Sequence, residues 1–289
     1  MRSSLLTCLG VAIAGLLGSA TARCGTRAPT KEEYDAFGAL HQMEKRAWLS
    51  ARQNPILVPV YVHVVLDADD PLVAAQIDAQ FVVLKTTFQR YGITLNLADV
   101  KKTISPDLSV GPKSYVTDEP KFLDFVKATR IGDYTSLNVY YYSNMSLDTI
   151  DGGLGFCALP REDAVDTDYF WNDACHVNLD TVPGRPQLRQ FNLNLGMVTV
   201  HQVGHWFGLL HTFENGCNPP GDMIDDTPYE ARPASGCPHG SDTCPQPGLD
   251  PIHNYMDYSD NPWYVPLSSF LALFNFPLVP LPSCSRLLI

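Results

Sequence analysis

The stretch HQVGHWFGLLHTF, residues 201–213, brings three histidines close together in the chain. Its pattern predicts a helix that ends at Gly208. Because four residues make roughly 400° of helical rotation, His201 and His205 would project from one face, about one turn apart. A glycine at 208 permits a sharp turn that would return His211 toward the other two. The spacing therefore predicts that three imidazoles reach a single metal ion.

Three neutral imidazoles leave one or two coordination positions open, which is typical of a catalytic zinc site and not of a closed structural one. Imidazole suits zinc among the abundant ions, although ligand type alone leaves copper and nickel open. Gln202 is unusual in this setting, because a zinc hydrolase is expected to carry its general base at that position. The stretch therefore predicts a hydrolase, or a protein that is shaped like one.

The composition describes an acidic chain with enough apolar residues for one large domain or two small ones. It has 289 residues, 45% of them hydrophobic, and a formal net charge of −11. No cluster of lysine and arginine stands out in the sequence. We therefore expect neither nucleic acid nor an anionic membrane surface as a partner.

The first 22 residues, MRSSLLTCLGVAIAGLLGSATA, have the organisation of a secretory signal peptide. Arg2 supplies the basic start, residues 5–17 form an apolar run too short to span a bilayer, and Ala20-Thr21-Ala22 forms a small-x-small cleavage site. A membrane anchor is the alternative interpretation. The sequon that begins at Asn144 fits a secreted glycoprotein. We therefore predict an extracellular protein.

Hydrophobic patterning predicts a mixed α/β layer with a twisted sheet. Residues 56–66, ILVPVYVHVVL, are rich in β-branched side chains and predict a buried strand. A helix over 71–89 is expected next, with Asp70 as its cap. The glycines of GGLGFCALP allow another chain to approach closely. The further expectations are strands at 93–100 and 137–144 and helices at 119–129 and 194–209.

The chain divides into segments of different character. Residues 23–55 form a short, mostly polar segment that precedes the first strong strand, and residues 56–211 carry the alternation of strands and helices. Residues 212–261 are rich in Gly, Pro, Asp, Asn and Cys, so we expect disulfides or ions to hold them. Residues 262–289 have frequent prolines and no amphipathic period. We interpret this tail as translated non-coding sequence, with a processed lipid-anchor signal as the alternative.

The number of cysteines indicates one special thiol. The sequence has eight cysteines, of which Cys8 would leave with the signal peptide. The seven that remain should mostly pair in an oxidising compartment, which leaves an odd one.

The pattern H-x-x-x-H-x-x-G-x-x-H, followed by Met256 in HNYMDYS, resembles the signature of the metzincin metalloproteases. Within that group the chain resembles the pappalysin-like secreted metalloproteases, particularly their fungal branch. The resembling stretches are RCGT, VPVYVHVV, GGLGFC, TVPG, HWFGLLHTF, GC, DDTP and DPIHNYMDYSD, which extend from Cys24 to about Asp260. The resemblance implies an α+β metzincin-type catalytic domain with a twisted, mostly parallel sheet and an antiparallel edge strand. A backing helix and an active-site helix would pack on the sheet, and an irregular, disulfide-rich C-terminal subdomain would follow.

The resemblance also implies roles for individual residues. His201, His205 and His211 would bind zinc. Met256 would form the apolar floor beneath the metal. Tyr258 would lie near the ion and stabilise an oxyanion, although a packed core tyrosine is the alternative. GGLGFC would be the edge strand that pairs with an extended peptide or protein substrate.

Further roles follow from the same resemblance. Asp222 and Thr227 in GDMIDDTP would be ligands in a calcium loop, with a solvated turn as the alternative. Cysteine pairs resembling those of the family are Cys157–Cys175 and Cys217–Cys244. Cys237 would normally pair with a cysteine after the Met-turn, where Trp263 stands instead, and Cys284 is a substitute.

Cys24 in RCGT resembles a cysteine switch, in which a thiolate of a prosegment occupies the open metal position and enforces latency. Lys45-Arg46 offers a dibasic cleavage site that would release such a prosegment. The alternative is that Cys24 is disulfide-bonded.

Gln202 departs from the pattern of the family, in which a glutamate follows the first histidine and serves as general acid and base. An amide has no useful basicity, and losing a positioned general base typically costs roughly 10² to 10⁴ in rate. Zinc should stay bound, because this residue is not a ligand. We therefore predict a secreted zinc metalloprotease that hydrolyses peptide bonds by zinc-activated water, acts as a monomer, and has weak or lost activity. The alternative is a catalytically inactive, zinc-loaded relative that binds peptides, whereas a zinc-stabilised structural protein has little support.

Overall fold

A five-stranded sheet forms the centre of the molecule. The structure is a computed structural model, which describes residues 24–48, 56–112, 120–145, 154–161, 164–186 and 193–259. The strand order is β2-β1-β3-β5-β4. All neighbouring strands run parallel except β4, which lies antiparallel to β5 at one edge. The strands are β1 (Ile56–Leu66), β2 (Ile93–Ile104), β3 (Leu137–Tyr142), β4 (Gly155–Cys157) and β5 (Cys175–Asn178).

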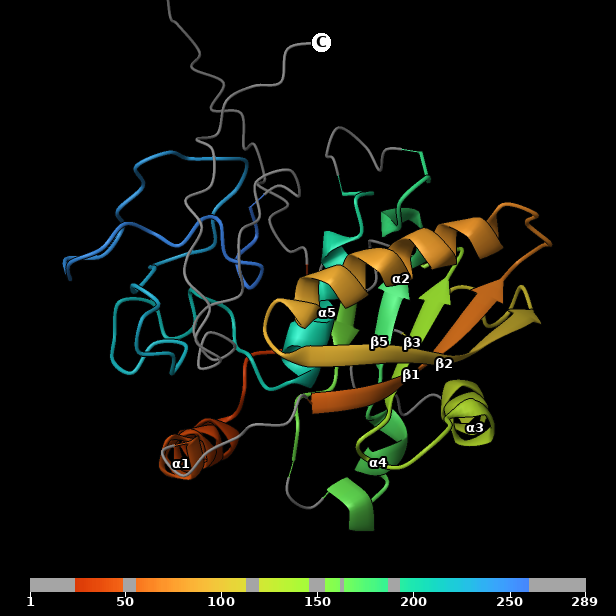
Figure 1. Ribbon diagram of the computed structural model, residues 1–289, viewed down its shortest axis with the longest axis horizontal. Helices are drawn as coiled ribbons and strands as arrows, with labels where there is room; N and C mark the ends of the chain where they lie inside the picture. Colours follow the sequence, from red (N-terminus) through yellow and green to blue (C-terminus); the bar gives the residue numbers. More distant parts are fainter. Residues whose placement is uncertain are drawn as a thin grey trace, which may run out of the picture.

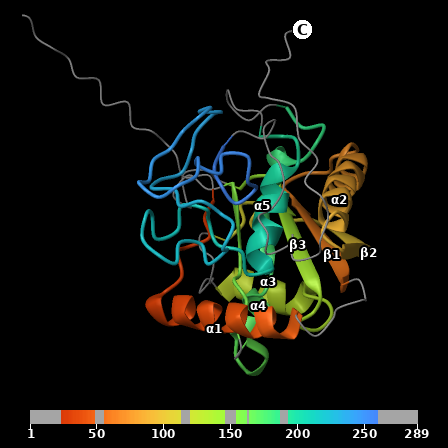
Figure 2. The same cartoon turned by 60° about the vertical axis from the view of Figure 1, so that its left-hand side comes forward.

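Helices cover both faces of this sheet. Helices α2 and α5 lie on one face, and α3 and the short α4 lie on the other (Figure 1). The remaining helix, α1, lies at the end of the molecule away from α2 (Figures 1 and 2). The helices are α1 (Lys31–Trp48), α2 (Val73–Gln89), α3 (Pro120–Thr129), α4 (Tyr169–Asn172) and α5 (Met197–Trp206), with single 3-10 turns at Ala164–Asp166 and Leu179–Thr181.

The two-residue period of the strands divides the core into two layers. In β1, Val60, Val62 and Val64 pack with the apolar residues of α2 and α5. Val65, which points to the opposite face, joins a second cluster with Tyr140 and residues of α3 and α4. Both faces of β1 are therefore buried along its second half, which explains the nearly continuous apolar run of this strand.

The predicted strand over 56–66 is confirmed, and the predicted second strand is longer than expected. It runs to Ile104 because β1 pairs with it along its whole length, as far as Leu66 opposite Ile104. Helix α3 lies where a helix was predicted. Strand β3 lies in its predicted place but ends at Tyr142. Strand β5 and helix α4 were not predicted.

Two predicted helices begin or end at the wrong residue. Helix α2 starts at Val73, because Asp70 accepts the N–H of Leu72 in a turn and does not cap the helix (2.9 Å). Helix α5 was expected over 194–209 but spans only Met197–Trp206. Gly196 and Gly208 flank it at φ 85° and 90°, and left-handed backbone cannot continue a right-handed helix.

Helix α1 was missed, although the sequence carried a signal for it. Thr30 and Glu33 form a capping box: the Thr30 hydroxyl accepts the Glu33 N–H at 3.2 Å, and Glu33 accepts the Thr30 N–H at 2.9 Å. The Tyr34 hydroxyl donates to the carbonyl of Gly221. The segment ahead of β1 is therefore a docked helix and not merely a polar leader.

The described residues after α5, 207–259, contain no helix or strand, which agrees with the expectation of an irregular segment. The predicted disulfide Cys217–Cys244 closes a loop within it, and Cys237 is also disulfide-bonded. The second predicted disulfide, Cys157–Cys175, joins β4 to β5. The signal peptide, the tail over 262–289 and Cys284 lie outside the described residues. No helix among the described residues is long and apolar enough to cross a membrane.

A buried ion pair links α3 to the segment before β5. Arg130 Nη2 lies 2.7 Å from Asp173 Oδ2, with side chains only 1% and 3% exposed. We expect Arg130→Met to lower the free energy of unfolding by about 3–5 kcal/mol, because it leaves a buried carboxylate without its counter-charge. Urea denaturation at pH 7.5 measures this.

The matched control is Lys127→Met, near the end of α3, which Arg130 directly follows. Lys127 pairs with Asp168 at 3.2 Å, but these side chains are 36% and 78% exposed. Its loss should change the stability by less than about 1 kcal/mol. Equal effects of the two substitutions would contradict the role given to burial.

Candidate metal centre

Helix α5 places two histidines on one face, and the turn after it supplies a third. The rings of His201 and His205 lie 4.7 Å apart, and Gly208 at φ 90° turns the chain back so that His211 joins them. The Nε2 atom of His205 lies 3.1 Å from that of His201 and 3.2 Å from that of His211. The predicted convergence of the three imidazoles is therefore present.

Backbone carbonyls determine which nitrogen of each ring faces the centre. His201 Nδ1 lies 2.6 Å from the carbonyl oxygen of Tyr255, and His205 Nδ1 lies 2.7 Å from that of Leu209. Because a carbonyl only accepts, both Nδ1 atoms carry the hydrogen and both Nε2 atoms present lone pairs. Lone pairs at such short separations repel unless a cation lies between them. The donor set therefore fits a metal ion.

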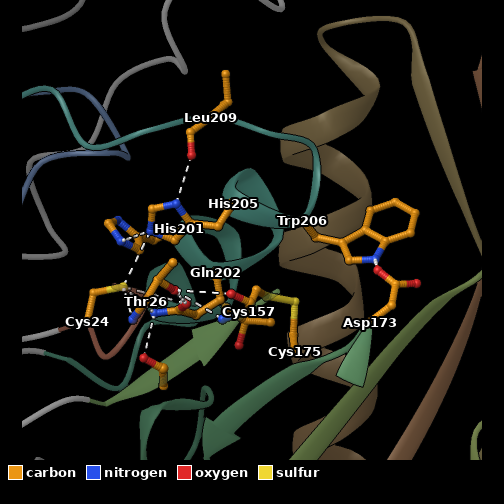
Figure 3. The surroundings of a disulfide bond; sticks show 12 residues. Cys24, Thr26, Cys157, Asp173, Cys175, His201, Gln202, His205, Trp206 and Leu209 are labelled. Carbon is orange, nitrogen blue, oxygen red and sulfur yellow. Dashed lines mark hydrogen bonds between the residues drawn. A yellow bond between two sulfur atoms is a disulfide. The ribbon is translucent and has the colours of Figure 1, made fainter. Parts of the chain in front are cut away.

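Cys24 supplies a fourth donor to this cluster. Its Sγ lies 3.4 Å from His205 Nε2, and the four ligand atoms of Cys24, His201, His205 and His211 all lie within 4.8 Å of one another. Cys24 is buried and is a free thiol, so the alternative that it is disulfide-bonded is wrong. Figure 3 shows its sulfur turned toward His201 and His205.

The charges of the cluster also favour a cation. Burial alone would raise the pKa of Cys24, but His205 and His201 lower it well below its ordinary value. Burial lowers the pKa of His205 to about 4 and opposes charging His211, whose pKa Cys24 and Glu214 nevertheless raise to about 9. The negative charges of Cys24 and Glu214 therefore stabilise a positive charge within the buried histidine cluster.

Met256, which the resemblance placed beneath the metal, packs directly against helix α5. It is only 1% exposed, and a Cβ added at Gly204 would lie 2.5 Å from its Sδ. Gly204 therefore lets the Met-turn approach α5 closely. The same segment supplies the Tyr255 carbonyl that orients His201.

Tyr258 also lies in the centre. Its hydroxyl is 3.3 Å from His211 Nε2 and donates to the backbone carbonyl of Cys24 at 3.4 Å. The hydroxyl faces the metal position and not the apolar core. This placement suits the predicted role of an oxyanion donor.

Gln202 is fully buried between the N-terminal segment and the edge strand. Its Oε1 accepts a hydrogen bond from the Thr26 hydroxyl at 3.2 Å. Its Nε2 donates to the carbonyl of Gly155 at 3.0 Å and to Cys24 Sγ at 3.3 Å. The amide thus uses both its donor and its acceptor beside the metal position (Figure 3).

Residues 24–26 lie along edge strand β4. The Gly25 N–H donates to the Gly155 carbonyl at 2.8 Å, and the Cys157 N–H donates to the Thr26 hydroxyl at 3.1 Å. An extended chain therefore occupies the edge that was predicted to bind substrate. The role of Thr26 was not predicted, and the stretch RCGT was its only signal in the sequence.

A second missed contact fixes the C-terminal end of α5. Trp206 directly follows His205 in the chain. The indole N–H of Trp206 donates to Asp173 Oδ1 at 2.9 Å (Figure 3). Asp173 is the buried partner of Arg130. Burial raises the pKa of Asp173 to about 6, which Arg130 only partly opposes. The helix that carries two of the histidines is thereby attached to the opposite layer of the fold.

Two other predictions lie away from this centre. Asp222 and Thr227 are both buried in the irregular segment, and Asp222 accepts the Ile224 N–H at 3.0 Å. Burial and the charge of Asp226 raise the pKa of Asp222 to about 8, against the hydrogen bonds that it accepts. Asn144 is exposed in a turn after β3. The calcium and glycosylation sites stay predictions.

A mostly parallel sheet with an antiparallel edge strand, three histidines on and after one helix, and a methionine beneath them define a metzincin-type metallopeptidase. The family model of M43 peptidases, described as pregnancy-associated plasma protein-A, matches residues 124–266. Together with the relatives below, it shows that the chain belongs to this pappalysin family of metalloendopeptidases.

The relatives include fungal proteins that match most of the chain. An extracellular metalloprotease of Pyricularia oryzae is 40% identical over 254 residues, covering 84% of this chain and 83% of that protein. Another, of Colletotrichum graminicola, is 37% identical over 270 residues, covering 89% of this chain and 91% of that protein.

Solved structures share the fold. A mutant promirolysin of Tannerella forsythia is 20% identical with a TM-score of 0.63, covering 87% of this chain and 91% of that one. Mature mirolysin in complex with a cleaved peptide is 21% identical with a TM-score of 0.53, covering 76% of this chain and 90% of that one.

The close approach at Gly204 can be tested by double substitution. We expect Gly204→Ala to lower the free energy of unfolding by about 1–3 kcal/mol, because the new methyl group displaces Met256. In a Met256→Ala background the same substitution should be neutral, or stabilising by up to about 1 kcal/mol, because alanine favours a helix. Urea denaturation of the four proteins measures the difference, and an equal cost in both backgrounds would contradict this contact.

Proposed function

We propose that this chain is a secreted zinc metalloendopeptidase whose hydrolytic step is weak or lost. Three Nε2 atoms that converge on one buried point, with the opposite ring nitrogens of His201 and His205 held by carbonyls, carry the proposal. Among the abundant metal ions, zinc is the one best suited to a set of three imidazole ligands. The extracellular relatives and the predicted signal peptide over 1–22 support secretion.

Bound zinc would supply Lewis-acid activation of a water and of the scissile carbonyl. His201, His205 and His211 would hold it, and Met256 would form an apolar floor on the side of the site next to Gly204. Strand β4 would bind an extended peptide through its main chain, as it binds residues 24–26. The Tyr258 hydroxyl would donate to the oxygen that gains charge.

Gln202 is the residue that limits this chemistry. It reaches the same position as the glutamate of the family, but its amide neither accepts a proton at neutral pH nor delivers one to the leaving amine. A second candidate function follows, in which the cleft binds peptides and does not cleave them. The buried amide of Gln202, with hydrogen bonds on both of its polar atoms, favours that candidate.

Cys24 would keep the chain latent until the N-terminal segment is removed. Its sulfur occupies the open side of the histidine cluster, which is the side a substrate must reach. Lys45-Arg46 lies in the last turns of α1. Because proteases bind extended chains, cleavage there requires the end of the helix to unwind.

The proposal extends to the remaining sites of the chain. Asp222 and Thr227 would bind calcium, and Asn144 would carry a glycan. The protein would act as a monomer on peptides and extracellular proteins.

The base at position 202 can be restored by one substitution. In a Cys24→Ala background, which removes the fourth ligand, we expect Gln202→Glu to raise the rate of casein cleavage by roughly 10² to 10⁴. Zinc content, measured by metal analysis, should stay equal in both proteins, because residue 202 is not a ligand. Rapid cleavage by the Gln202 protein that a chelator abolishes would contradict the limited role given to the amide.

The calcium assignment predicts a cation-dependent stability. Extracellular calcium modules bind with Kd near 10⁻⁴–10⁻³ M, so 10 mM calcium should stabilise the chain by about 1.4–2.7 kcal/mol. Thermal unfolding with and without calcium measures this. Asp222→Asn should abolish the gain, whereas magnesium at the same concentration should give little. A gain that survives the substitution would place calcium elsewhere.

A further inference from the structure

Gln202 holds the N-terminal segment as well as occupying the position of the general base. Its Nε2 donates to Cys24 Sγ at 3.3 Å, and its Oε1 accepts from the Thr26 hydroxyl at 3.2 Å. The same Nε2 donates to the Gly155 carbonyl at 3.0 Å, which fixes the amide against the edge strand. One side chain thus contacts both the segment and the strand on which the segment lies.

These contacts need an amide. The Gly155 carbonyl carries no hydrogen and only accepts, and the Nε2 of Gln202 supplies its donor at 3.0 Å. The same Nε2 also donates to the Cys24 sulfur at 3.3 Å. A glutamate carboxylate at this position would place an acceptor against the Gly155 carbonyl and would lose both hydrogen bonds, although it would still accept from Thr26.

The remaining contacts of the segment do not depend on residue 202. The sulfur also accepts the Thr26 N–H at 3.3 Å, the Gly25 N–H pairs with β4, and the Tyr258 hydroxyl donates to the Cys24 carbonyl. A chain with glutamate at 202 would retain all of these. Gln202 therefore adds hydrogen bonds to a segment that other contacts also bind to the cleft.

We propose that Gln202 is a binding residue for the Cys24–Thr26 segment, and that it adapts the cleft to retain an extended peptide whose cysteine side chain faces the metal position. This inference rests on the proposed function in one respect, since the metal is the one that the histidines would hold. It goes beyond that function, because the glutamine is given a positive role in binding and not only the loss of a base. The expected ligands are extended peptides that carry a cysteine, and the chain's own residues 24–26 are the example in this structure.

The reactivity of Cys24 tests the proposal in the full-length, metal-loaded chain. Iodoacetamide alkylates Cys24 only when the segment leaves the cleft, and peptide mapping by mass spectrometry reports its rate separately from other thiols. Gln202→Glu leaves two buried acceptors without the amide donor, so it should accelerate alkylation roughly 10- to 100-fold. Gln202→Ala, which removes the donor and adds no charge, should give a smaller acceleration.

Gln76→Glu is the matched control. Gln76 lies on α2 and is also buried. Its Nε2 likewise donates to a glycine carbonyl, that of Gly184, at 3.1 Å. This control carries the same chemical change at a site that does not contact the segment, so it should leave the alkylation rate within about twofold of the original protein. A comparable acceleration in the control would overturn the proposal, because general loosening of the fold would then explain the effect.

Metal analysis of the same samples separates this proposal from the proposed function. Equal alkylation rates in the original chain, Gln202→Glu and Gln202→Ala at equal zinc content would overturn the role of Gln202 and leave the zinc site intact. Absence of zinc from every sample would overturn the proposed function, while the ratio of alkylation rates would still decide the role of the amide. Should Gln202→Glu fail to fold, Gln202→Ala alone decides, since it must exceed the rate of the original protein.

Discussion

The close approach of three imidazole Nε2 atoms in a buried site is the constraint on which the rest of this structure depends. The rings cannot turn away, because the Nδ1 atoms of His201 and His205 donate to the carbonyls of Tyr255 and Leu209. Those carbonyls come from two different places, the Met-turn and the turn after Gly208. The metal site therefore requires that both segments pack against α5, and the histidine spacing alone would not create it.

Local periodicity is the part of this arrangement that the sequence predicts well. The helical spacing of His201 and His205, the glycine turn before His211 and the apolar run of β1 each depend on residues that are neighbours in the chain. These signals were sufficient for the histidine cluster and for a mixed α/β layer with a twisted sheet, whereas the mostly parallel order of the strands followed from the family resemblance. They were less accurate for boundaries, because the ends of α5 depend on two glycines whose left-handed backbone became visible only in the structure.

Contacts between distant segments are the part that the sequence could not predict. Nothing in the residues around Trp206 indicates that its indole donates to Asp173, or that Asp173 is paired with Arg130 on another layer. In the same way, the position of Thr26 between Gln202 and β4 follows from docking of a segment far away in sequence. Such contacts join groups that are separated by many residues, so periodicity carries no information about them. Only the capping box of α1 was a local signal that had been overlooked.

The two roles that we propose for Gln202 act in the same direction. Glutamate and glutamine have nearly the same shape, so the geometry of the site is kept. The difference is the amide NH₂ group of Gln202, which donates hydrogen bonds where a carboxylate oxygen would accept them. Hydrolysis needs that group to take up a proton, which the amide does not do. Retention of the N-terminal segment needs it to donate to Cys24 and Gly155, which the amide does at 3.3 and 3.0 Å. On the proposed function, replacing glutamate by glutamine would weaken catalysis and strengthen binding of the segment together, because one amide donates at the position where hydrolysis needs a base.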